Sequence, residues 1–214
     1  MDTITPSDYR PDKVSPLRHD APGGVTEMPS PTKIHHVHIF SDLNYDAQVE
    51  FYKRLFNLDV VTLRNEGFTF MTFDDHDHRV VLIKRPGWGT KPSQSVGFSH
   101  VAFCYASLGE LIYVYKKMKG WGYTDNIHCT NHGNSTSFYY TDIDGNRCET
   151  MMDNFTPLET KDYKRHFQFT EEFGVTAEAD FDPDKMVALY ESGMPDSVLI
   201  NREEVRELVK EGKL

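Results

Sequence analysis

The sequence has no long hydrophobic run and no excess of basic residues. Lys and Arg together number 23 against 33 Asp and Glu, which gives a formal net charge of −10. A surface that binds nucleic-acid phosphates needs clustered Lys and Arg, so nucleic acid is not expected as a partner. No apolar stretch reaches membrane-spanning length, and the first residues lack a basic region followed by a hydrophobic one. We therefore expect a cytoplasmic protein that does not associate with membranes.

Cysteine is also scarce. The three cysteines, Cys104, Cys129 and Cys148, form no CxxC pair and lie on or beside predicted strands. An odd number without paired spacing is typical neither of a disulfide framework nor of a zinc site. These residues are interpreted as reduced side chains that pack in the core.

The composition changes twice along the 214 residues. Residues 1–32 are rich in proline and polar side chains, and such a segment cannot bury enough apolar area to fold alone. An extended, draped or disordered N-terminal arm is expected there. Residues 156–214 are charged and sparsely apolar, with helical patterns after Asp182 and over 202–210. This C-terminal tail is expected to be partly helical and to pack over a sheet edge or a neighbouring subunit.

The middle of the chain, residues 33–155, contains the same pattern of elements twice. Hydrophobic periodicity predicts one helix and four strands in each copy, with a breaker-rich linker over 85–94. In the second copy, Ser107 and Glu110 form a capping-box signature that opens the helix. The predicted fold class is α+β, with two tandem βαβββ modules at 33–84 and 97–155. Their strands are expected at 33–41, 58–64, 69–73, 79–84, 98–105, 123–129, 135–141 and 147–152, and their helices at 45–57 and 107–119.

The two copies differ in the residues that could bind a metal ion. His36 and His100 occupy the same place at the start of the first strand of each copy. Two residues past an equivalent arginine, the first copy has Val81 and the second has Glu149. If the copies fold alike and pair, His36, His100 and Glu149 converge while the fourth position stays apolar. Two imidazoles and one carboxylate with open positions are the ligand set of mononuclear non-haem Fe(II) oxygenases.

Two neighbouring histidines compete with His36 for this role. Strand alternation puts His36 and His38 on one face and His35 on the other. A lone histidine on a strand is most often a packing residue, and only the shared register with His100 favours His36. Glu149 lies in an apolar sequence, where an unpaired charge would be costly to bury, although a solvent-facing position is the alternative.

Three further residues lie close to this candidate site in the predicted fold. His78 precedes the last strand of the first copy, and His132 and Tyr139 belong to a hairpin of the second. A strand-turn-strand arrangement would bring Tyr139 next to Glu149. The alternative interpretation is a polar turn for His78 and sheet packing for Tyr139.

These features resemble the vicinal oxygen chelate superfamily, which includes glyoxalases, bleomycin-resistance proteins and extradiol dioxygenases. The resemblance rests on the paired βαβββ units, the His-Val strand openings and the sequence Asp-Gly-Asn-Arg-Cys-Glu at 144–149. Within the superfamily, the sequence is most similar to single-domain type I extradiol ring-cleaving dioxygenases of the catechol and biphenyl-2,3-diol kind. The likeness implies one open-barrel metal-binding domain, iron ligands at His36, His100 and Glu149, and catalytic roles for His78, His132 and Tyr139.

The resemblance further implies an Fe(II)-dependent enzyme that inserts O2 into the ring of a catechol-type substrate. The expected partners are a small aromatic diol and further copies of the same chain, as a dimer or higher homo-oligomer. Mn(II) is the alternative metal. A glyoxalase-like isomerase or lyase is one alternative function, but it generally uses four ligand positions, and Val81 supplies no ligand. A non-enzymatic binding module of the same fold is another, which normally lacks metal ligands.

Overall fold

The computed structural model describes residues 30–31, 33–65, 67–92, 96–123, 126–166 and 179–214. Contacts divide the chain into a unit at 1–35 and a unit at 36–214. The second unit carries both modules and the tail, and the description below concerns it. The proline-rich arm predicted at 1–32 lies almost wholly outside the described residues. Among the helices that the structure describes, none has the length and apolarity needed to cross a membrane.

The first module is a four-stranded sheet covered by one helix. In the chain, strand β1 (Val37–Ser41) is followed by helix α2 (Tyr45–Phe56) and by three strands. Strands β1 and β4 are parallel neighbours, and the other pairs are antiparallel, in the order β1-β4-β3-β2. The three later strands are β2 (Asp59–Asn65), β3 (Phe68–Thr72) and β4 (Val80–Lys84).

The second module repeats this topology. It contains strands β5 (His100–Cys104), β6 (His128–Asn131), β7 (Ser135–Thr141) and β8 (Arg147–Asp153), and helix α3 (Leu108–Gly120). Their order is β5-β8-β7-β6, with β5 and β8 parallel. His38 pairs with Val81 in the first sheet, and Ala102 pairs with Glu149 in the second. The predicted α+β class and internal duplication are confirmed, and Val81 and Glu149 occupy equivalent positions.

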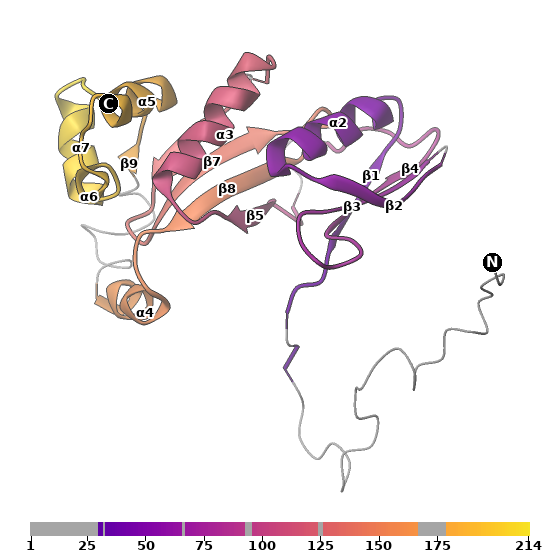
Figure 1. The fold of residues 1–214 in the computed structure, drawn as a ribbon, viewed down its shortest axis with the longest axis horizontal. Coiled ribbons are helices and arrows are strands. Elements are labelled where there is room, and N and C mark those ends of the chain that lie inside the picture. Colours follow the sequence, from indigo (N-terminus) through magenta and orange to yellow (C-terminus); the bar gives the residue numbers. More distant parts are fainter. Residues whose placement is uncertain (1–29, 32, 66, 93–95, 124–125, 167–178) are drawn as a thin grey trace, which may run out of the picture. The chain divides into compact units, whose positions relative to one another are not determined.

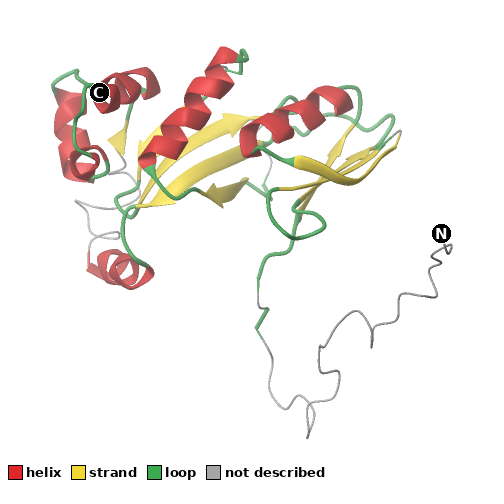
Figure 2. Ribbon diagram, in the orientation of Figure 1, coloured by secondary structure: helices red, strands yellow, loops and turns green. Residues whose placement is uncertain are grey.

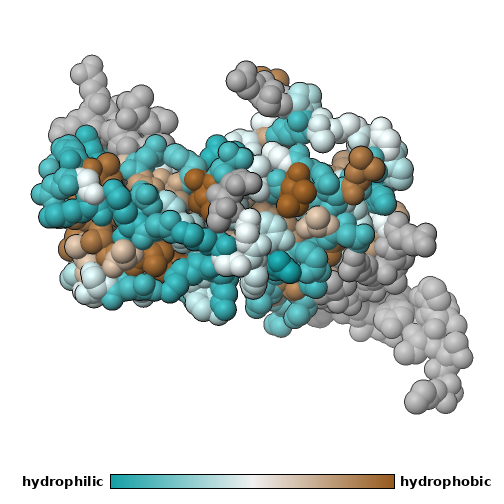
Figure 3. Space-filling view, turned by 90° about the horizontal axis from the view of Figure 1, so that it is seen from above, coloured by the Kyte–Doolittle hydropathy of each residue, from teal (hydrophilic) through white to brown (hydrophobic). Residues whose placement is uncertain are grey.

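Each helix covers one face of its own sheet (Figures 1 and 2). Leu111 and Met118 of α3 are fully buried with Phe138 and Cys148 of the second sheet. Successive side chains of a strand point to opposite faces. His100, Tyr139 and Glu149 therefore lie on the face away from α3, which we call the open face of the second sheet. Seen from above in Figure 3, the surface shows separate hydrophobic residues between hydrophilic ones.

Local signals set the ends of the helices as expected. The Ser107 side chain accepts a hydrogen bond from the amide of Glu110 at the start of α3, which satisfies one of the amides left free at a helix N-terminus. At the end of α3, Gly122 adopts a positive φ of 84° and the amide of Tyr123 bonds the carbonyl of Met118. This closure removes Tyr123 from the strand predicted at 123–129. Strand β6 begins only at His128, so that prediction was wrong at its start.

The strand predicted at 33–41 is also shorter than expected. It begins at Val37, whose amide bonds the carbonyl of Arg79 at 3.0 Å. His36 therefore lies immediately before the ladder rather than within it. Because β1 and β4 run parallel, the residues that precede them, His36 and Arg79, lie at the same end of the two strands.

The two modules contact each other through α2 and the turn between β7 and β8. The carboxylate of Asp142 in that turn accepts hydrogen bonds from Gln48 Nε2 at 2.9 Å and from Tyr52 Oη at 2.8 Å. Gln48 and Tyr52 are both fully buried on α2, and Asp142 is 4% exposed. The rings of Phe56 and Phe103 add an apolar contact, with centroids 3.9 Å apart. The buried Asp142 carboxylate thus joins the two modules through residues that are 90 and 94 positions away in the sequence.

The C-terminal tail extends the second sheet and its core. Strand β9 pairs antiparallel with β6, so the tail packs on a sheet edge, as one of the two predicted options stated. Phe181, Met186 and Val205 from the tail belong to the same buried cluster as the module residues. Helices α5 and α7 match the two predicted patterns, whereas α4, β9 and α6 were not predicted. The tail elements are α4 (Pro157–His166), β9 (Ala179–Asp180), α5 (Pro183–Glu191), α6 (Asp196–Leu199) and α7 (Arg202–Lys210).

Candidate metal centre and its surroundings

The open face of the second sheet carries a buried carboxylate next to an imidazole. His100 Nε2 lies 3.0 Å from Glu149 Oε2, and the side chains are 33% and 8% exposed. The parallel pairing of β5 and β8 places both residues on one face. Among the described residues, no Lys or Arg lies within ion-pair distance of Glu149. A buried carboxylate without a fixed cation is costly, and a divalent metal bound with His100 would remove that cost.

Tyr139 and His132 surround this pair. Tyr139 is directly opposite Glu149 in the β7–β8 ladder, and its ring lies edge-on to that of His100 with centroids 5.3 Å apart. Tyr139 Oη lies 3.0 Å from Nε2 of His132. Burial and the nearby Glu149 carboxylate raise the pKa of Tyr139 well above its usual range. The hydroxyl is therefore a neutral hydrogen-bond donor at physiological pH.

His36 and His78 lie close together in the first module, just before the parallel strands β1 and β4 begin. His78 Nε2 lies 3.2 Å from His36 Nδ1, and His78 Nδ1 lies 2.5 Å from a carboxylate oxygen of Asp77. A carboxylate only accepts hydrogen bonds, so the neutral form of His78 donates from Nδ1 and accepts at Nε2. His36 then carries its hydrogen on Nδ1 and its lone pair on Nε2. This tautomer is the one that ligates a metal through Nε2, with the other nitrogen oriented by a hydrogen-bond chain.

The six residues singled out in the sequence thus form two groups. His36 and His78 belong to the first module, and the other four belong to the second. Within the part of the chain that the structure describes, the donor atoms of His36, His100 and Glu149 do not all lie within 4.8 Å of one another. The complete three-ligand set therefore stays a prediction. The second-module group comprises His100, His132, Tyr139 and Glu149.

The first module has no carboxylate at the position of Glu149. Val81 is 4% exposed there and pairs with His38 and Phe70 on its two neighbouring strands. His38 borders a cavity rather than the pair of His36 and His78, and burial followed by the charge of Arg85 lowers its pKa. The two modules share their topology, but they do not share the same set of metal-donor residues.

Sequence reasoning missed three residues around these groups. Asp77 orients His78, His128 lies with its ring 5.8 Å from that of Tyr139, and Arg147 has its guanidinium carbon 4.7 Å from the centre of the Tyr139 ring. The β6–β7 register pairs His128 with Tyr139 directly. Asp77 could have been noticed as a carboxylate adjacent to His78, whereas the position of His128 depended on where β6 begins.

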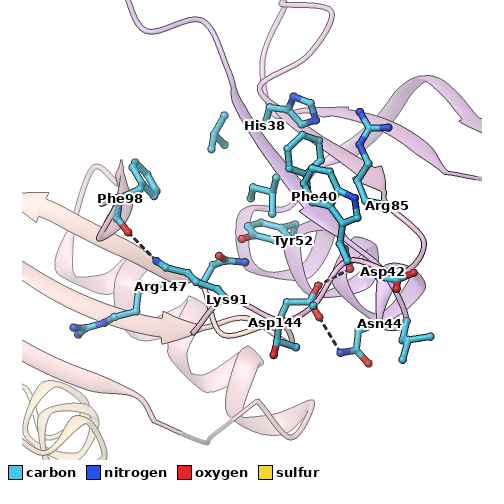
Figure 4. Close-up of a pocket in the computed structure, with 18 of the residues that line it drawn as sticks. His38, Phe40, Asp42, Asn44, Tyr52, Arg85, Lys91, Phe98, Asp144 and Arg147 are labelled. Carbon is cyan, nitrogen blue, oxygen red and sulfur yellow. Dashed lines mark hydrogen bonds between the residues drawn. The ribbon is translucent and has the colours of Figure 1, made fainter. Parts of the chain in front are cut away.

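A cavity of about 410 Å³ opens beside these groups, between β1, the 85–91 segment and the start of the second module (Figure 4). None of the six predicted residues lines it. Val37 and Val101, which directly follow His36 and His100, do line it, as does Arg147. Because successive side chains of a strand point to opposite faces, Val101 borders the cavity from the face opposite to that of His100.

Comparison with known proteins identifies the family. Residues 33–150, more than half of the chain, match the model of the Glyoxalase/Bleomycin resistance protein/Dioxygenase superfamily. The chain belongs to this superfamily. The resemblance expected from the paired modules is thereby confirmed.

Two curated proteins from Rhodococcus globerulus are similar to this chain in sequence. Biphenyl-2,3-diol 1,2-dioxygenase 3 is 36% identical over 145 residues, which cover 66% of this chain and 74% of the relative. Biphenyl-2,3-diol 1,2-dioxygenase 2 is 33% identical over 138 residues, which cover 64% and 71% of the two chains. Among solved structures, lactoylglutathione lyase from Agrobacterium tumefaciens is 21% identical with a TM-score of 0.44, covering 58% of this chain and 96% of that one. The similarity to dioxygenases thus spans the larger part of both relatives.

Proposed function

We propose that the chain is an Fe(II)-dependent extradiol dioxygenase that cleaves the ring of a catechol-type substrate with O2. His36, His100 and Glu149 would hold the metal, and Mn(II) is the alternative metal for the same donors. The substrate would be a small aromatic diol. Assembly into a homo-oligomer stays a prediction.

The observation that carries this proposal is the buried pair of Glu149 and His100, together with the apolar Val81 at the position equivalent to Glu149 in the first module. A carboxylate, an imidazole and a second imidazole with its lone pair on Nε2 fit a hard or borderline divalent ion. With valine at the fourth position, three protein ligands leave coordination sites for a chelating diol and for O2. The 36% identity to a biphenyl-2,3-diol 1,2-dioxygenase supports the same chemistry.

The residues around the metal position divide the remaining work. When bound, Fe(II) supplies Lewis acidity toward the diol and the redox chemistry toward O2. Tyr139 donates a hydrogen bond to a substrate oxygen as negative charge develops there. His132 would orient the Tyr139 hydroxyl, with Nε2 donating to Oη when that hydroxyl donates to the substrate. Asp77 orients His78, and His78 fixes the ring of His36 because its Nε2 accepts a hydrogen bond from His36 Nδ1.

Metal binding is the first test of the ligand assignment. Glu149→Gln keeps the size of the side chain but removes the charge, so we expect anaerobic reconstitution with Fe(II) to give far less bound iron than in the wild type. His36→Ala should have the same effect. Glu204→Gln, an exposed carboxylate on α7, is the matched control and should bind iron normally. Circular dichroism checks that each variant is folded, and stoichiometric iron in folded Glu149→Gln would refute the assignment.

Oxygen uptake tests the reaction. The iron-loaded protein should consume O2 with at least one member of a panel of catechols, with the absorbance of a ring-opened product. Absence of uptake with every catechol, together with turnover of a hemithioacetal, would favour the glyoxalase-like alternative and contradict the proposal.

A further inference from the structure

The two copies use the same Asp and Arg motif in different ways. In the first module, Asp74 and Arg79 form a two-pronged ion pair with nitrogen–oxygen distances of 2.7 to 3.1 Å. In the second module, the equivalent Asp142 turns toward α2 and accepts from Gln48 and Tyr52. The duplicate of Arg79, which is Arg147, is thereby left without its carboxylate.

Arg147 keeps its charge on the open face of the second sheet. It pairs with His100 in the β5–β8 register, and its guanidinium carbon lies 4.7 Å from the centre of the Tyr139 ring. Its side chain is exposed, and among the described residues no carboxylate lies within 4.0 Å of its guanidinium. In a protein with a net charge of −10, an exposed arginine next to a predicted metal site is a suitable partner for an anion.

The cavity that Arg147 borders has the size and chemistry for a substrate side chain. Its volume of about 410 Å³ lies within the usual range for small-molecule sites. Two further cations, Arg85 and Lys91, line it, and the ring of Trp88 is exposed. Figure 4 shows Arg147 at one edge of the cavity, with Lys91 bonded to the carbonyl of Phe98 at 2.9 Å.

The acidic residues of the cavity already have partners. Asp144 accepts hydrogen bonds from Ser41 Oγ at 2.5 Å and from Asn44 Nδ2 at 2.8 Å. Asp42 accepts from the amide of Gly87 at 2.8 Å. The three cations of the lining outnumber these two carboxylates, so the cavity carries a net positive charge toward a ligand.

We propose that Arg147 is a specificity-determining residue that binds the carboxylate of an acidic side chain on the aromatic diol substrate, at the edge of the cavity where its guanidinium lies over the Tyr139 ring. The identification of this ligand as the substrate rests on the proposed function. The diol would face the predicted metal ligands, and the acidic chain would extend past Arg147. The substrate class is therefore a catechol with a short carboxylate-bearing side chain, rather than an uncharged alkyl or aryl catechol.

Kinetics with matched substrates test this selectivity. The wild type should have a kcat/KM for 3-(2,3-dihydroxyphenyl)propanoate about 10- to 100-fold above that for the corresponding neutral amide, as expected for one charge-assisted hydrogen-bonded pair. Arg147→Gln should lose this preference, and the loss should appear mainly as a raised KM for the acid. Arg147→Lys should restore part of it. Arg54→Gln, which removes an arginine stacked over Trp121 away from the cavity, is the control and should keep the preference.

Equal kcat/KM for acid and amide in the wild type, or an unchanged preference in Arg147→Gln, would overturn the proposal while leaving ring cleavage intact. Binding to the metal-free protein separates the two proposals. In an NMR titration, 3-phenylpropanoate should bind at least tenfold more tightly than 3-phenylpropanamide, and Arg147→Gln should abolish the difference. If that result is obtained but no catechol is turned over, the proposed function fails and the anion site stands. If the acid and the amide bind alike, the anion site fails.

Discussion

The buried carboxylate of Asp142 takes part in the contact between the modules, and Asp142→Asn tests its contribution. One carboxylate oxygen of Asp142 accepts from the turn amides of Asp144 and Asn146, at 3.0 and 2.7 Å. The other accepts from Gln48, from Tyr52 and from the Asn146 side chain, at 2.9, 2.8 and 2.9 Å. An asparagine can keep its carbonyl toward the turn, so its NH2 group then faces donors. The substitution therefore removes the hydrogen bonds that Asp142 accepts from α2 and leaves those from the turn amides in place.

The expected cost follows from the burial of the partners. Gln48 retains a second acceptor in Asp144 at 3.1 Å, but the buried Tyr52 hydroxyl loses its charged acceptor. A hydrogen bond to a charged group contributes about 1.5–3 kcal/mol, and a buried donor left unsatisfied costs a similar amount. We expect Asp142→Asn to lower the free energy of unfolding by about 2 kcal/mol. Tyr52→Phe should cost a similar amount, and the double variant should cost less than the sum.

Urea unfolding at neutral pH, followed by circular dichroism, measures these changes. The matched control is Asp74→Asn, which changes the equivalent residue of the first module, where the carboxylate is bonded to Arg79 near the surface. It should cost less, because the Asp74 side chain is 35% exposed and water can replace part of the bonding that the carboxylate loses. Equal losses for Asp74→Asn and Asp142→Asn, or strict additivity of Asp142→Asn and Tyr52→Phe, would refute the role assigned to Asp142.

Three further predictions follow from single residues. Tyr139→Phe should lower kcat about 100-fold with normal iron content, because a donor to developing charge is lost; unchanged turnover would contradict the role of the hydroxyl. Ser107→Ala should destabilise the protein by about 1 kcal/mol in urea unfolding, since it removes the N-cap of α3, and no loss would mean that water replaces the cap. Hydrogen bonds from Lys119 and Tyr115 lower the pKa of Asp184. Its contribution to stability should be fully present above about pH 4 and lost as the pH falls through the lowered pKa, so the difference between wild type and Asp184→Asn should disappear in acid and not in base.

Much of the fold could be predicted because its periodic signals are local. Strand β7 has the bounds expected from the sequence, and helix α7 begins at Arg202 and ends at Lys210 as expected. The equivalence of Val81 and Glu149 followed from aligning Arg79 with Arg147, and the sheet registers agree with it. An internal repeat makes such predictions possible, since each copy serves as a template for the other.

The elements that were missed lack such signals. Helix α4 has no buried residue, so it shows no apolar stripe, and only the capping box of Thr156 and Glu159 indicates its start. Strand β9 has two residues and no periodicity to detect. Two donors to Asp142, Gln48 and Tyr52, come from α2 of the other module, so only the folded chain shows that this carboxylate is buried. Arg147 is not paired with Asp142 because the Asp142 carboxylate is bonded to Gln48 and Tyr52, which the sequence alone does not show.

Isotope incorporation tests the central claim most directly. The iron-loaded protein is mixed anaerobically with a catechol that it binds and then exposed to ¹⁸O2, and the product is analysed by mass spectrometry. A ring-cleaving dioxygenase places both atoms of O2 in the ring-opened product, so we expect the doubly labelled species before exchange with water. A product without the label, or O2 consumption that yields only a quinone and reduced oxygen, would contradict the account.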